Sequence, residues 1–186
     1  WWRADSFDDV HADVTGNVWA RARSGAGPAV VLAAHLDTVF GRDVSHEIVR
    51  AGATLRGPGV GDDAVGVAGI SAAARLLRAA TAPVILAGNG VTQAEASDEL
   101  REVAELLGAP VATTLMAKGV FPEDHPLSVG MTGIWGTRVA NDQARSADVL
   151  LAVGTTFGEA DCSSWNPEYT FSIPPTRLIH IDADAA

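Results

Sequence analysis

The chain has 186 residues, 47% apolar and 19% charged, so it is long enough to bury the core of one domain or of two small ones. Its formal net charge is −10 and Lys118 is its only lysine, which argues against binding to nucleic acid or to an anionic membrane surface. Cys162 is its single cysteine, and no apolar run reaches the roughly 18 residues of a membrane helix. We therefore expect a cytoplasmic protein with no nucleic-acid or membrane partner. Because the chain starts with Trp1-Trp2-Arg3 rather than with methionine, we also expect that it belongs to a longer reading frame.

The first part of the chain contains predicted strands followed by one predicted helix. Turn-forming residues separate three apolar segments, at 10–14, 18–22 and 29–34. The segment 29–34 is apolar throughout, as in a strand that is covered on both faces. A loop rich in charge and glycine is expected over 41–61, and an alanine-rich helix then ends near Ala80.

A candidate metal site lies at the end of the third predicted strand. His35 ends that strand and Asp37 follows two residues later, and zinc prefers a neutral imidazole whose other ring nitrogen is held by a carboxylate. Asp62 lies in a glycine-rich turn, where its carboxylate would bind metal and could bridge two ions. A lone His-x-Asp triplet also arises readily by chance, so these residues alone leave a purely structural role open.

Two motifs of this part of the chain are HLDTVF at 35–40 and GPGVGDDAVG at 57–66. With them, the sequence over residues 5–80 resembles the zinc exopeptidases that include peptidase T and carboxypeptidase G. The resemblance implies that His35 and Asp62 are metal ligands and that Asp37, the vestige of a catalytic residue, orients His35. The family's paired glutamates, one of them the general base, do not follow the helix here. We therefore expect an incomplete zinc site and no peptidase activity.

From Pro83 onward, predicted strands alternate with predicted helices. The strands are short apolar segments at 84–87, 111–114, 148–154 and 177–182. Thr92 and Glu95 form a capping-box pair expected to open a helix that ends at Gly108. A loop rich in glycine and proline is expected over 122–136, followed by a helix at about 137–145. This alternation predicts an α/β fold with a parallel sheet and helices on both faces, Rossmann-like in the C-terminal part.

The turn after the strand at 84–87 is the first candidate binding element of this part. Gly88 and Gly90 would let backbone amides approach a phosphate or a neighbouring chain closely. Gln93 stands where the dinucleotide fingerprint has its third glycine, so a simple tight turn explains the pattern equally well. Asp182, at the end of the last strand, could accept a ribose hydroxyl or serve only as a cap.

Six motifs follow one another in the second part of the chain: PVILAGNGV at 83–91, LGAPVATTLMAKG at 107–119, FPEDHP at 121–126, GMTGIWGT at 130–137, ADVLLAVGT at 147–155 and HID at 180–182. In their order and spacing, residues 83–186 resemble, nearly end to end, the central domain of thiamine-diphosphate-dependent enzymes of the acetolactate synthase and decarboxylase type. The resemblance implies the cofactors thiamine diphosphate and magnesium. In that family two other domains hold them, one through a glutamate and one through a Gly-Asp-Gly loop, and we expect both domains to be absent from this chain.

Some members of that family bind FAD or ADP in the central domain. By the resemblance, the cofactor-binding positions here are Gly88, Gly90, Met116, Lys118, Gly133, Thr137, Gly154 and Asp182. Flavin-binding relatives usually have an arginine where Thr156 stands and an acidic-acidic-arginine run soon after. Both are missing, which argues against FAD.

The sequence therefore predicts two parts: a truncated zinc-exopeptidase-like segment at 1–80 and a thiamine-enzyme central domain at 83–186. The leading functional hypothesis is a non-catalytic scaffold or assembly module, which acts as a homo-oligomer or with catalytic domains that this chain lacks. One alternative is a zinc-dependent exopeptidase or deacylase fragment that retains partial metal binding. Another is a module that binds ADP or FAD through the Gly88 turn.

Overall fold

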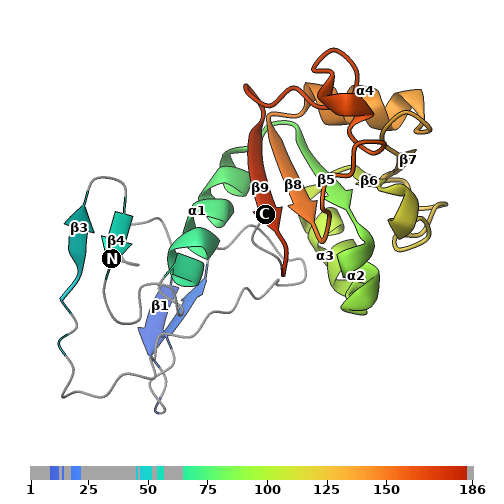
Figure 1. The fold of residues 1–186 in the computed structure, drawn as a ribbon. Helices are drawn as coiled ribbons and strands as arrows, with labels where there is room; N and C mark the ends of the chain where they lie inside the picture. Colours follow the sequence, from blue (N-terminus) through green and yellow to red (C-terminus); the bar gives the residue numbers. More distant parts are fainter. Residues whose placement is uncertain are drawn as a thin grey trace.

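The computed structural model describes residues 9–12, 14, 18–21, 45, 47–51, 54–56 and 65–183. Its main feature is a parallel sheet of five strands in the order β7-β6-β5-β8-β9 (Figure 1). The strands are β5 (Pro83–Ala87), β6 (Val111–Thr113), β7 (Ser128–Met131), β8 (Val149–Val153) and β9 (Arg177–Ile181). Because β6 and β7 extend the sheet on one side of β5, and β8 and β9 on the other, the strand order reverses at β5. The predicted α/β, Rossmann-like fold is confirmed.

Helices cover both faces of this sheet, because successive side chains of each strand point to opposite faces. On one face, Ile85 and Leu151 pack with residues of α1 (Val65–Ala79) and α3 (Ser97–Leu107). On the other face, Leu86 and Leu150 pack with alanines of α4 (Arg138–Ser146). All four of these strand residues are buried, which explains why the predicted strands read as continuous apolar runs.

The helix boundaries confirm some of the local predictions and correct one. Gly108 ends α3 in a left-handed conformation with φ of 59°, and its N–H reaches the carbonyls of Ala104 and Glu105. The predicted capping pair was wrong, because the short helix α2 (Asn89–Gln93) begins directly after the Gly88 turn and already contains Thr92. Glu95 then adopts φ of 55°, which interrupts the helix before α3 starts at Ser97.

Three strands lie where the sequence indicated loops. The sequence did not predict β7, because Gly130, with φ of 89°, interrupts an already short apolar pattern. β3 (Val49–Ala51) and β4 (Thr54–Arg56) form an antiparallel hairpin inside the loop expected at 41–61.

The N-terminal predictions are tested only in part. β1 (Asp9–Ala12) and β2 (Val18–Arg21) pair antiparallel, which confirms the first two predicted strands. α1 confirms the helix expected to end near Ala80. The predicted strand at 29–34 lies outside the described residues. Among the helices that the structure describes, none is long and apolar enough to cross a membrane.

Candidate functional site

The eight cofactor-binding positions predicted in the C-terminal part lie where the parallel strands end, because each position follows a strand. We call this end of the sheet the carboxyl edge. Gly88 and Gly90 follow β5, Met116 and Lys118 follow β6, Gly133 and Thr137 follow β7, Gly154 follows β8 and Asp182 follows β9. Open parallel sheets bind ligands outside the carboxyl ends of the strands, at the point where the strand order reverses. The turns after β5 and β8 flank that point here.

The three glycines at this point pack backbone against backbone. The Gly88 N–H donates to the Val153 carbonyl at 2.8 Å, and the Gly90 N–H donates to the Gly154 carbonyl at 2.9 Å. A Cβ on Gly88 would lie 2.2 Å from the Gly154 carbonyl oxygen, and one on Gly90 would lie 2.6 Å from the Gly154 Cα. The close approach that the sequence indicated is thus made to the neighbouring turn of the same chain.

The loops after β6, β7 and β8 are joined to one another by hydrogen bonds. The Leu115 N–H donates to Asp161 Oδ1 at 3.1 Å, and the Ile134 N–H donates to the Ala160 carbonyl at 2.9 Å. Lys118, three residues beyond Leu115, pairs through Nζ with Glu123 Oε1. These bonds fix the loops of the carboxyl edge relative to one another.

Large apolar side chains of the joined loops face solvent. We call them the apolar edge patch, and they are Leu115, Met116, Ile134 and Trp135. Their exposed fractions run from 45% for Leu115 to 71% for Met116. The predicted Met116 therefore lies at the surface, and the loop after β7, which bonds to the same segment at 160–161, exposes two further large apolar side chains. Exposed apolar surface of this kind is typical of interaction sites.

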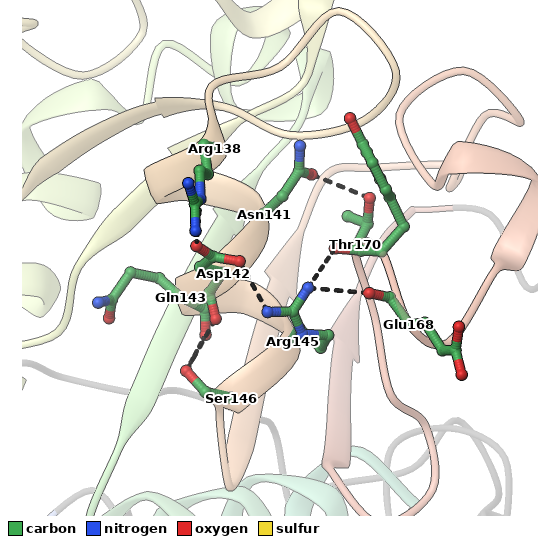
Figure 2. A network of polar contacts seen from close by, with 9 residues as sticks. Arg138, Asn141, Asp142, Gln143, Arg145, Ser146, Glu168 and Thr170 are labelled. Atoms are coloured by element: carbon green, nitrogen blue, oxygen red, sulfur yellow. Dashed lines mark hydrogen bonds and ion pairs between the residues drawn. The ribbon is translucent and has the colours of Figure 1, made fainter.

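A buried asparagine, which sequence reasoning missed, positions the loop after β7. Asn141 accepts from the Gly133 N–H at 2.9 Å and donates through Nδ2 to the Gly133 carbonyl at 3.1 Å. Its Oδ1 also accepts from Thr170 Oγ1 at 2.9 Å (Figure 2). The sequence offered one signal, because Asn141 shares the buried face of α4 with Ala140 and Ala144.

The N-terminus of α4 is capped by the predicted residue Thr137. Thr137 Oγ1 accepts from the Ala140 N–H at 3.0 Å and donates to the Val129 carbonyl at 2.8 Å. Near the other end, Arg145 donates to Asp142 Oδ1 at 2.7 Å and to the Glu168 carbonyl at 2.9 Å (Figure 2). Thr137 therefore acts here as a helix cap that also holds β7.

The last predicted position, Asp182, lies beside a histidine. His180 Nε2 donates to the Thr155 carbonyl at 2.8 Å, which requires the proton on that nitrogen. Asp182 Oδ2 lies 3.8 Å from the same nitrogen, and its side chain is 17% exposed. This contact ties the end of β9 to the loop after β8.

The described residues do not fit a metal or a thiamine diphosphate site. No three His, Cys, Asp or Glu side chains within them lie together where they could hold an ion. A magnesium diphosphate needs several free oxygen donors. Carboxylates of the loops at the carboxyl edge are already engaged within the chain: Asp161 accepts from the Leu115 N–H, Glu123 pairs with Lys118, and Asp182 lies beside His180. The predicted metal residues His35, Asp37 and Asp62 lie outside the described residues.

The single cysteine is not a nucleophile in this fold. Cys162 is buried at 0% exposure among the residues packed against α4. Burial and, as a smaller contribution, the negative charge of Asp161 together raise the pKa of its thiol to about 12. The reactive form of cysteine is the thiolate, so the neutral thiol here serves packing.

The sheet and its carboxyl edge define a Rossmann-like α/β domain. A family model for the central domain of thiamine pyrophosphate enzymes matches residues 70–186, more than half of the chain. The chain therefore belongs to that family. A second model, for Peptidase family M28, matches residues 17–92 and overlaps the first at 70–92.

Curated relatives agree with this assignment. A probable acetolactate synthase large subunit of Methanocaldococcus jannaschii is 45% identical over 117 residues, which are 63% of this chain and 19% of that protein. An acetolactate synthase of Mycobacterium avium is 44% identical over 113 residues, 61% of this chain and 18% of that protein. A sulfoacetaldehyde acetyltransferase of Castellaniella defragrans is 37% identical over 176 residues, 94% of this chain and 28% of that protein. The chain thus spans about a fifth of the length of the acetolactate synthases.

The alignment with the sulfoacetaldehyde acetyltransferase covers 94% of this chain, so it includes residues on both sides of 80–83. The family match also begins inside α1, at residue 70. The division of the chain into parts at 1–80 and 83–186 stays a prediction.

Proposed function

We propose that this chain is a scaffold or assembly module: the central domain of a thiamine-diphosphate-dependent enzyme of the acetolactate synthase type, without catalytic activity of its own. The apolar edge patch is the observation that carries the proposal. Hydrogen bonds between the loops after β6, β7 and β8 hold this patch in place, and it exposes Met116 and Trp135 at the carboxyl edge. A fixed apolar surface is suited to packing against another protein domain.

The chemistry of the described residues supports a role in positioning. Thiamine diphosphate supplies the carbanion-stabilising group in enzymes that use it, and their protein supplies orientation and charge. The amides of Gly88 and Gly90 already donate to neighbouring carbonyls, and Lys118 is paired with Glu123. These groups hold the loops in place, so the domain contributes a rigid surface for catalytic domains elsewhere. We place the protein in the cytoplasm on the basis of its single cysteine.

Activity assays test the non-catalytic part of the proposal. The purified chain is supplied with thiamine diphosphate, magnesium and pyruvate, and acetolactate is measured. We expect no product and no heat of thiamine diphosphate binding in calorimetry. Turnover by the bare chain would contradict the proposal.

Binding of a hydrophobic dye tests the apolar edge patch. Replacement of Met116 and Trp135 together by serine should lower the fluorescence of bound dye by at least about half, because it removes half of the patch residues. Val139→Ser is the matched control, since Val139 is also exposed, at 57%, but lies on α4 outside the patch. Equal loss in the control would show that the dye does not report on the patch.

A second candidate function is a zinc hydrolase remnant, favoured by the Peptidase family M28 match over 17–92. That range contains His35, Asp37 and Asp62. Elemental analysis and zinc titration of the wild type and of His35→Ala test it, with His46→Ala as a control histidine outside the two motifs. Zinc lost only in His35→Ala would support the remnant. ADP and FAD titrations in the same buffer test the nucleotide-binding alternative.

A further inference from the structure

The turn after β5 contains an asparagine followed by a glycine, the pair Asn89-Gly90. The other three asparagines of the chain precede valine, aspartate and proline. Asparagine is chemically labile because the backbone nitrogen of the next residue can attack its side-chain carbon Cγ. A following glycine has no Cβ to obstruct that attack, so Asn89 is intrinsically the most reactive asparagine of this chain.

The reaction, deamidation, consumes only water. The Gly90 nitrogen loses its proton and forms a bond to Asn89 Cγ, the side-chain nitrogen leaves as ammonia, and a five-membered succinimide ring remains. Water then opens the ring at one of its two carbonyl carbons. Attack at Cγ gives aspartate, whereas attack at the main-chain carbonyl carbon gives isoaspartate. In isoaspartate the main chain runs through Cβ and Cγ and is one atom longer.

The fold restrains both groups that would react. The Gly90 N–H donates to the Gly154 carbonyl at 2.9 Å, which keeps the proton of this nitrogen engaged with the turn after β8. Asn89 is the first residue of α2, and ring closure requires its ψ to leave the α-helical value. Both restraints hold only while the turns after β5 and β8 are in contact.

The contact between these turns leaves no room for a longer main chain. A Cβ on Gly154 would lie 2.7 Å from the Gly90 Cα and 2.8 Å from the Val91 nitrogen. All of these atoms belong to the backbone, which cannot yield cheaply. An extra main-chain atom directly before Gly90 would displace it from Gly154, so a chain with isoaspartate at this position cannot remake the contact.

We propose that Asn89 is a deamidation site, which the native fold keeps unreactive and which reacts when the turns after β5 and β8 separate. Isoaspartate then prevents the turns from closing again. The modification therefore permanently marks chains that have opened at this point of the sheet.

Mass spectrometry of the full chain tests the first step, because deamidation replaces an amide by an acid and changes the mass of the peptide that contains Asn89. The protein is incubated in native buffer and in urea at the same mildly alkaline pH and temperature. We expect the native rate to be at least about 30-fold lower, because only molecules with separated turns react. Asn166 is the internal control, since the nitrogen of Pro167 carries no proton and cannot close the ring, and its amide should persist in both samples.

Two glycine variants test whether the turn contact provides the protection. Gly88→Ala forces the turn against Gly154 apart and should raise the rate in folded protein at least about threefold, whereas Gly69→Ala on α1 should not. Circular dichroism establishes that both are folded. If Gly88→Ala does not fold, wild type in urea below its unfolding transition takes its place, and its rate should rise with urea. Equal rates in native and denatured protein, or a native rate that neither change raises, would overturn the proposal.

Refolding tests the second step. Chains deamidated in urea are returned to native buffer, and isoaspartate at position 89 is measured in the folded and unfolded fractions from fragment masses. We expect the folded fraction to contain at least about tenfold less of it. Asn89→Asp is the control, because it carries the same charge on an ordinary backbone and should refold like wild type. Isoaspartate at equal levels in both fractions would contradict this step, and so would a failure of Asn89→Asp to refold, since charge would then be the cause.

Discussion

Glycines 88 and 69 show how differently one residue type can act in this chain. A Cβ on Gly88 would lie 2.2 Å from the Gly154 carbonyl oxygen and 2.6 Å from the Thr155 Cα, and backbone atoms cannot yield cheaply. A Cβ on Gly69, in the exposed middle of α1, meets nothing within 4 Å. The first glycine is required by packing and the second is not.

We predict that Gly88→Ala destabilises the fold by about 3 kcal/mol, the cost of overpacking a rigid contact. Gly69→Ala, the matched control, should stabilise it by about 1 kcal/mol through helix propensity. Urea denaturation of both variants measures the difference. A neutral Gly88→Ala would mean that the turns after β5 and β8 can move apart.

Asp148 anchors the segment where the two sequence resemblances meet. Its Oδ2 accepts from the Thr81 N–H at 2.7 Å and from Thr81 Oγ1 at 2.9 Å, and its Oδ1 accepts from the Ala82 N–H at 3.1 Å. The backbone hydrogen bond from Thr81 is the main cause that lowers the pKa of this carboxyl below its ordinary value of 3.8. The folded protein therefore favours the charged form.

We predict that Asp148→Asn lowers stability by about 1 kcal/mol, a small value because solvent screens the site. A lowered folded-state pKa stabilises the protein above about pH 4, and that stabilisation is lost as the pH falls through the folded-state value. The difference between wild type and variant should therefore be largest near neutral pH and shrink in acid. Thermal melts across this range measure it, with the exposed Asp124→Asn as control. A difference independent of pH would contradict the assigned cause.

The thiol of Cys162 should be inert in the native protein. With a pKa of about 12 caused by burial, roughly one thiol in ten thousand is ionised at pH 8. We predict almost no labelling by a thiol reagent in native buffer and complete labelling in denaturant, counted by mass spectrometry. Rapid native labelling would show that the packing against α4 opens readily.

At the scale of elements, α4 holds the carboxyl edge through one side chain. Asn141 bonds to both backbone groups of Gly133 and to Thr170, so its removal leaves buried polar groups without partners. We predict that Asn141→Ala costs about 3 kcal/mol, and that Gln143→Ala, at an exposed position of the same helix, costs less than about 0.5 kcal/mol. Chemical denaturation measures both. Similar costs would mean that the Asn141 bonds are replaced by water.

The buried strands could be predicted from the sequence, whereas other elements could not. β5 and β8 are apolar on both faces, so their continuous apolar runs were enough to predict them. The sequence did not predict β7, because its pairing with β6 depends on a left-handed Gly130 and on a shifted register. Tertiary contacts set both features. The predicted helix start at the Thr92–Glu95 capping pair was wrong, because the turn after Gly88 already starts α2 at Asn89. Tertiary structure overrides a local capping pattern here.

At the scale of the whole molecule, the topology explains why positions spread from Gly88 to Asp182 lie at one edge. Each follows a parallel strand, and parallel strands end on the same side, so an alternating pattern already predicts the juxtaposition. The pattern does not predict how that edge is held together. Asn141, the bond from Leu115 to Asp161 and the contact of Gly90 with Gly154 each require the folded arrangement of loops.

The described parts of the chain should differ strongly in stability. β5 and β8 are buried and have neighbours on both sides, whereas β3 pairs with β4 alone among the described strands and is exposed at all three residues. Two-stranded hairpins are marginal in water on their own. Amides that open only by global unfolding exchange slowest, and exposed local structure exchanges fastest.

We therefore predict that amides of Ile85 and Leu151 exchange with deuterium at least about 1,000-fold more slowly than those of β3, relative to their intrinsic rates. Exchange followed by mass spectrometry at neutral pH measures both regions in one sample. α1 is the internal control, because it packs on the sheet through one face only and should fall between them. Protection of β3 equal to that of β5 would show that the hairpin folds cooperatively with the sheet, and the large gap in local stability would then not exist.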